Sequence, residues 1–176
     1  MSAFPPSAGP LLVVGVGNSL MTDDGIGIAA IERLRDGWEL DPEVELVDGG
    51  VWLLSLLPAV EESSGLLLLD AINAKQPPGT VIELERDEIP RFLEAMLSPH
   101  QVGVRDLLAL CSLRDSLPAR TAALGIQPAR IELGTELSPI VQGSLDMLLE
   151  RVVRRLDEWG YPALGRRLAL PVSCTR

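Results

Sequence analysis

Acidic side chains stand where several predicted strands end. Asp23 and Asp24 follow the first predicted strand, and Asp48 and Asp70 each end a later one. Because ligands of parallel α/β sheets bind at the carboxyl ends of the strands, we expect these side chains to converge on one edge of the sheet. Two adjacent carboxylates there cost stability unless they are solvated or paired, so Asp23 and Asp24 need an explanation.

His100 is the chain's single histidine and stands at a predicted helix start. In Ser98-Pro99-His100-Gln101, serine is expected at the N-cap, proline at the first helical position and glutamine two positions later. The positive end of the helix dipole disfavours imidazolium, so it favours the neutral form that ligates metals. A lone histidine is more often structural than catalytic, so position alone leaves its role open.

The positions of these residues depend on strands that alternate with helices. The predicted strands are the apolar runs Leu11–Val14 and Leu66–Leu69, the alternating segments Val44–Asp48 and Thr80–Leu84, and Thr121–Ile126. Helices are predicted after Gly25, Ser98 and Ser138, and the last has an apolar stripe from Val141 to Trp159. This alternation predicts a three-layer α/β sandwich with a mainly parallel twisted sheet flanked by helices.

The length of 176 residues predicts a single domain, residues 1–176, with its core at about 11–160. We expect a short flexible arm in MSAFPPSAGP and a basic tail in Ala163–Arg176. Hydrophobic residues make up 47% of the chain and aromatic residues only 3%, so the core must be aliphatic.

The net charge of −10 argues against nucleic acid or an anionic membrane as a partner. No segment is long and apolar enough to span a bilayer, and the first residues lack the features of a signal peptide. Cys111 and Cys174 provide neither a disulfide framework nor metal-ligand spacing. We therefore expect a cytoplasmic protein.

The glycines of the first loop are compatible with nucleotide binding, but the neighbouring residues argue against it. Gly15 and Gly17 fit a dinucleotide fingerprint, but Leu20 stands where the third glycine belongs. Asp23 and Asp24 would also repel a pyrophosphate. A simpler interpretation is that the glycines allow a tight turn and one of the two aspartates caps the following helix.

The whole pattern from Gly15 to Gly27, G-x-G-N-x-L-x-x-D-D-G-x-G, closely resembles the opening motif of the hydrogenase maturation proteases. The resemblance continues through Asp48-Gly49-Gly50, Asp70-Ala71 and Ser98-Pro99-His100-Gln101, and covers roughly Leu11 to Trp159. It implies an aspartyl-type endopeptidase that removes the C-terminal extension of the large-subunit precursor of a nickel–iron hydrogenase.

The resemblance also implies which residues form the site. The family's two carboxylates fall on Asp24 and Asp70, and its histidine falls on His100, as catalytic and metal-ligating residues. Such a set suits nickel, zinc or manganese. The family implies nickel already inserted into the precursor, so the resting enzyme is expected to be metal-free. Whether a metal-bound water or a carboxylate base drives hydrolysis stays open.

Two other functions fit part of this pattern. A nickel-sensing assembly chaperone without cleavage would use the same three ligands. A hydrolase of the peptidyl-tRNA type could share the α/β frame, but the acidic charge and the lack of a basic groove count against it. The sequence shows no coiled-coil seam, so we expect a monomer.

Overall fold

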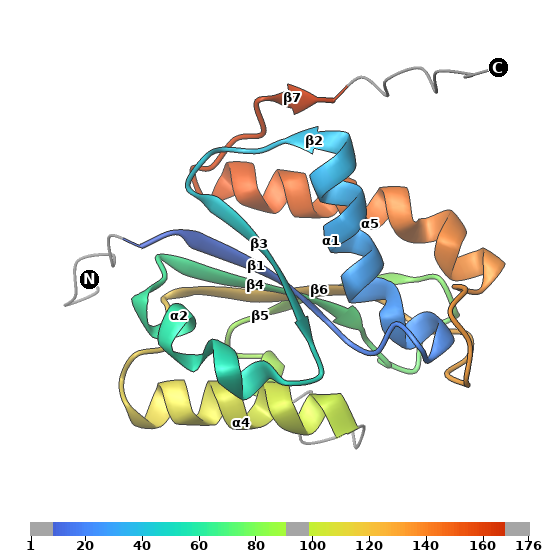
Figure 1. The fold of residues 1–176 in the computed structure, drawn as a ribbon, viewed down its shortest axis with the longest axis horizontal. Helices are drawn as coiled ribbons and strands as arrows, with labels where there is room; N and C mark the ends of the chain where they lie inside the picture. Colours follow the sequence, from blue (N-terminus) through green and yellow to red (C-terminus); the bar gives the residue numbers. More distant parts are fainter. Residues whose placement is uncertain (1–8, 91–98, 168–176) are drawn as a thin grey trace, which may run out of the picture.

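In a computed structural model, residues 9–90 and 99–167 are described, with only the backbone described for residues 99–102. A five-stranded sheet runs in the order β3-β1-β4-β6-β5 (Figure 1). Its strands are β1 (Leu11–Val16), β3 (Val44–Gly50), β4 (Gly65–Ala71), β5 (Val81–Glu85) and β6 (Arg120–Ile126). All pairings are parallel except that of β5, an antiparallel edge strand.

Helices cover both faces of the sheet, which confirms the predicted three-layer α/β fold (Figure 1). One layer holds α1 (Ile26–Gly37) and α5 (Pro139–Glu158), and the other holds α2 (Leu57–Glu62) and α4 (Pro99–Leu113). Two 3-10 turns, η1 (Thr22–Gly25) and η2 (Leu53–Leu56), lead into α1 and α2. No helix of the described ranges is long and apolar enough to cross a membrane.

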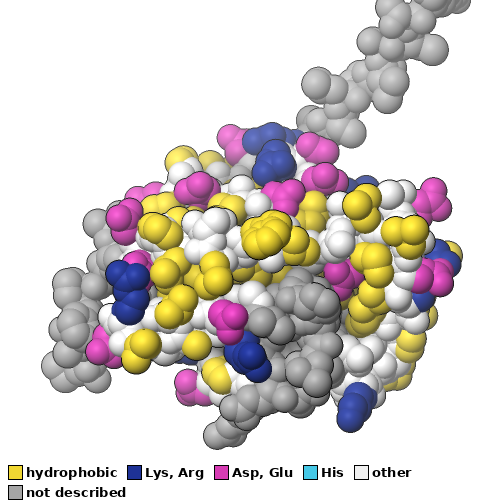
Figure 2. Space-filling view, turned by 60° about the horizontal axis from the view of Figure 1, so that its bottom comes forward, with side chains coloured by type: hydrophobic (Ala, Val, Ile, Leu, Met, Phe, Trp, Pro, Cys, Tyr) yellow, Lys and Arg dark blue, Asp and Glu magenta, His cyan; other side chains and the backbone are white. Residues whose placement is uncertain are grey.

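The central strands are apolar throughout because both of their faces are buried. In β1, Leu11 and Val13 pack in the core under α1 and α5, whereas Leu12 and Val14 pack in the opposite core. Helix α4 packs in this second core through an apolar face whose four members are all buried: Val104, Leu107, Leu108 and Cys111. The face covered by α2 and α4 also leaves hydrophobic side chains at the molecular surface (Figure 2).

The long helix α5 packs its predicted stripe on the sheet, with Val141, Leu145, Leu148, Val152 and Leu156 all buried. After Glu158, Gly160 adopts a φ of 92°, and its N–H donates to Asp157 O. The N–H of Tyr161 reaches back to Leu156 O, which completes a Schellman ending.

We expect Leu148→Ala to lower the free energy of unfolding by about 2–5 kcal/mol, because the side chain is fully buried and its removal leaves a cavity. The neighbouring Met147 is half-exposed, so Met147→Ala should change stability by less than about 0.5 kcal/mol. Urea melts of both variants measure the difference. Equal stabilities would mean that α5 is not part of the core.

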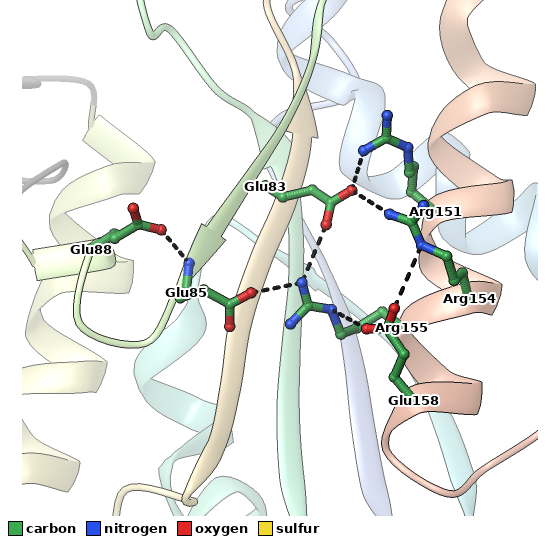
Figure 3. Close-up of polar contacts among 7 residues, drawn as sticks. All are labelled: Glu83, Glu85, Glu88, Arg151, Arg154, Arg155 and Glu158. Carbon is green, nitrogen blue, oxygen red and sulfur yellow. Dashed lines mark hydrogen bonds and ion pairs between the residues drawn. The ribbon is translucent and has the colours of Figure 1, made fainter.

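The edge strand β5 is fastened to α5 by ion pairs (Figure 3). Glu83 accepts hydrogen bonds from Arg151, Arg154 and Arg155, and Arg155 also pairs with Glu85. Burial would raise the pKa of Glu83, but the hydrogen bonds from Arg151 and Arg155 hold it below its usual range. This network fixes β5 in place without a further strand beyond it.

Two short strands were not predicted. Directly after α1, β2 (Trp38–Glu39) pairs antiparallel with β7 (Gly165–Arg166), which lies at the start of the predicted tail. The guanidinium of Arg166 also lies over the Trp38 ring, 4.7 Å from its centroid. Two-residue strands have too little periodicity to be recognised before the pairing is known. Residues 168–176 of the tail, with Cys174, lie outside the described residues.

Candidate active site

The strand order places a topological switch between β1 and β4, because the chain goes from β1 to β3 on one side and then to β4 on the other. Ligands of such sheets bind outside the carboxyl ends of the strands at this point. The turn that carries Asp24 follows β1, and Asp70 is the next-to-last residue of β4. These two predicted site residues therefore lie at the ends of neighbouring strands.

The glycines of the first loop allow the backbone to fold back closely on itself. Gly17 has a φ of 123°, and a β-carbon added there would lie 1.9 Å from Asp24 O. The N–H of Asn18 donates to Asp24 Oδ2 at 3.0 Å, and Asn18 Oδ1 accepts from the Leu20 N–H. The Asn18 side-chain amide thus orients the loop, and the turn holds the Asp24 carboxylate.

Gly27 brings the start of α1 against the ends of two strands. A β-carbon there would lie 2.2 Å from Leu69 O and 2.3 Å from Val16 O. Backbone atoms cannot move aside as a flexible side chain can. The glycines of the motif thus allow α1 to pack closely on β1 and β4. This packing explains the glycines without a bound nucleotide phosphate.

The carboxylates of Asp24 and Asp70 are almost completely buried, with 4% and 8% of their residue surfaces exposed. Asp70 Oδ1 accepts the Ala71 N–H at 2.7 Å, so its orientation is fixed by its own strand. The Asp24 carboxylate is in turn held by the Asn18 N–H, so both groups are oriented by backbone donors.

Asp23 does not cap the helix, contrary to the simpler interpretation of the sequence. Neither η1 nor α1 has a side-chain cap, and Asp23 points to a distant segment instead. Its Oδ2 accepts the N–H groups of Ala129 and Arg130 and the hydroxyl of Ser138, and its Oδ1 accepts the Ser138 N–H. Burial would raise the pKa of Asp23, but these hydrogen bonds lower it below its usual range.

Asp48 lies at a bulge near the end of β3. The pairing of β1 with β3 passes from Asp48 directly to Gly50, which leaves Gly49 without a partner in the register. Asp48 is exposed, and its Oδ1 accepts the Gly50 N–H at 3.0 Å. The Gly50 carbonyl in turn accepts the Gly17 N–H at 3.1 Å, so the bulge supports the first loop.

His100 lies in the first turn of α4, as predicted, but its side chain lies outside the described residues. Close by on the same helix, Gly103 faces Val51 and Leu53 just after β3, which puts this end of α4 beside the carboxyl edge of the sheet. No group of three His, Cys, Asp or Glu side chains able to hold a metal occurs among the described residues. The predicted set of Asp24, Asp70 and His100 thus stays a prediction.

Comparison with known proteins identifies the family. The sequence model of the hydrogenase maturation proteases matches residues 28–155. The chain belongs to the hydrogenase maturation protease family. This protease is therefore an endopeptidase, a hydrolase of peptide bonds. The resemblance carried by the opening motif is confirmed.

The relatives of the protease match it over most of their length. It is 38% identical to the hydrogenase expression/formation protein HupD of Rhodobacter capsulatus, over 91% of this chain and 76% of the relative. It is 34% identical to the hydrogenase 2 maturation protease of Escherichia coli, over 89% of this chain and 96% of the relative.

Solved structures of related proteases have the same fold. The hydrogenase maturating endopeptidase HybD of Escherichia coli superposes with a TM-score of 0.85 at 34% identity, over 90% of this chain and 98% of that one. The [NiFe] hydrogenase maturation protease HybD of Thermococcus kodakarensis has a TM-score of 0.68 at 29% identity, over 82% and 97% of the two chains.

The residues that hold the protease site together were harder to foresee than those that line it. Ser138 begins α5 as predicted, but its hydroxyl bonds Asp23 instead of capping the helix. Thr22 bonds Arg130 O and the Glu132 N–H through its own hydroxyl. The only sequence signal for these contacts was the presence of two adjacent carboxylates, which cost stability unless they are paired. In the structure, hydrogen-bond donors surround the buried Asp23 carboxylate and compensate this cost.

Proposed function

We propose that this protease removes the C-terminal extension of the large-subunit precursor of a [NiFe] hydrogenase after nickel has been inserted. Its family membership and its similarity to hydrogenase maturation endopeptidases support this substrate. The observation that carries the site assignment is the placement of Asp24 and Asp70, both nearly buried, at the ends of neighbouring strands beside the switch point.

In this proposal the nickel of the precursor is the feature that the protease recognises. Asp24, Asp70 and His100 supply two carboxylates and an imidazole, a donor set suited to nickel. Because nickel arrives with the substrate, the resting enzyme holds no metal. A precursor without nickel lacks the ion that this donor set binds, so we expect it to bind more weakly.

The peptide bond is hydrolysed by water at this edge of the sheet. Either the nickel activates this water, or Asp24 or Asp70 takes a proton from it as a general base. The tight turn around Asp24 and the strand that holds Asp70 restrict the motion of both groups, so their positions change little when the substrate binds.

We expect the wild-type protein to shorten a nickel-loaded precursor and to leave a nickel-free precursor intact, because only the loaded form presents the cation. Mass spectrometry of both precursors after incubation with the protein measures the outcome. Equal cleavage of the two forms would refute nickel recognition. Binding of the loaded precursor without any cleavage would instead support an assembly chaperone.

A further inference from the structure

Exposed hydrophobic side chains gather in the loops at the carboxyl edge of the sheet. Leu20 follows β1, Val51 and Trp52 follow β3, and Ile131 and Leu133 follow β6. Leu133 is 86% exposed and Trp52 is 82% exposed, although burial of such side chains is strongly favourable. Apolar surface of this kind marks interaction sites.

The loops that carry Leu20 and Leu133 are held together by hydrogen bonds. The Gly134 N–H donates to Leu20 O at 2.9 Å, and the Thr22 N–H donates to Gly134 O at 2.7 Å. The buried Asp23 ties the same two loops through Ala129 and Arg130. The backbone that carries the exposed side chains of Leu20 and Leu133 is therefore held in place by these hydrogen bonds.

The strand order sets these apolar groups on both sides of the candidate active site. In the order β3-β1-β4-β6, Val51 and Trp52 follow the first of these strands, and Ile131 and Leu133 follow the last. Between them, Asp24 lies in the turn that follows β1, and Asp70 lies near the end of β4. An apolar chain lying along this edge would contact both groups while one of its peptide bonds lies at the carboxylates.

We propose that Leu20, Val51, Trp52, Ile131 and Leu133 form the docking surface for an extended segment of the precursor with apolar side chains on both sides of the cleaved bond. This inference rests on the proposed function. The occupant is an extended polypeptide because a peptide bond must reach an edge whose carboxylates are almost buried. The apolar side chains follow strands that end at this edge. The backbone of an extended peptide can form hydrogen bonds with the polar backbone groups of the loops that it covers.

The test compares Leu133→Ser and Trp52→Ala with Leu113→Ser, in the full chain, with purified nickel-loaded precursor. Leu113 is 81% exposed but ends α4, which leads to the start of β6 at the opposite edge of the sheet. We expect the first two variants to raise KM roughly tenfold with kcat within about twofold, because uniform binding is lost. Leu113→Ser should match the wild type. Urea melts should show equal stability for all variants.

Three results would overturn the docking surface. One is a KM within twofold of wild type for both Leu133→Ser and Trp52→Ala while the wild type cleaves normally. Another is an equal rise in KM for Leu113→Ser. The third is a wild-type dimer that these two substitutions convert to a monomer in size-exclusion chromatography with light scattering, since a second copy would then cover the surface. A wild type that does not cleave the precursor would contradict the proposed function itself.

Discussion

Asp24→Asn and Asp70→Asn should each slow processing of the nickel-loaded precursor by at least about 100-fold, the lower end of the effect of removing a general acid or base. Asparagine keeps the size of the side chain and an oxygen that can accept the Asn18 or Ala71 N–H. It lacks the charge that binds a cation or takes a proton. His100→Ala should have a similar effect, because it removes the proposed third ligand. Single-turnover assays followed by mass spectrometry measure these rates.

A carboxylate far from the edge provides the control for these variants. Asp146 is exposed on α5 and pairs with Arg33, so Asp146→Asn should process the precursor at the wild-type rate. Urea melts at neutral pH identify any loss that comes from unfolding. If the folded Asp24→Asn and Asp70→Asn proteins both cleave within twofold of the wild-type rate, the assignment of this edge as the active site is wrong.

Asp23→Asn should lower the free energy of unfolding by at least about 3 kcal/mol at neutral pH. The carboxylate is fully buried and accepts four hydrogen bonds, three of them from the backbone N–H groups of Ala129, Arg130 and Ser138. An asparagine amide turns N–H groups toward some of these donors, and each buried donor left unsatisfied costs about 1–3 kcal/mol. Denaturant melts measure the loss.

Ser138→Ala provides a graded comparison, because it removes one donor and leaves Asp23 with its three backbone partners. Its cost should be about 1 kcal/mol, the usual net value of one hydrogen bond. If Asp23→Asn costs no more than Ser138→Ala, the charge of Asp23 does not hold the two loops together.

The advantage of the wild type over Asp23→Asn should also depend on pH. The pKa of Asp23 is lower in the folded protein than in the unfolded chain, so the unfolded chain takes up the proton first as pH falls. The stabilisation is complete above the ordinary aspartate pKa of about 3.9 and is lost as pH falls through the lower folded value. Melts of both proteins from neutral to acidic pH should therefore converge only at the acidic end.

Much of the fold could be predicted because its signals are local. The apolar runs of β1 and β4 indicate strands buried on both faces, and the apolar stripe of α5 indicates a helix buried on one face. Both patterns can be recognised without knowing the rest of the fold. The family could also be recognised from the sequence, because the motif from Gly15 to Gly27 lies in one continuous stretch. Asp24 and Asp70 were predicted for the edge where the structure places them.

The sequence by itself determined the element types, the family and the residues proposed for the site. Only the tertiary structure decided what Asp23 does, because its partners lie more than 100 positions away along the chain. The same holds for Gly27, whose requirement for glycine comes from the Leu69 carbonyl on another strand, and for the pairing of β2 with β7. Such contacts have no local period or spacing, so they become visible only when the folded chain brings distant segments together.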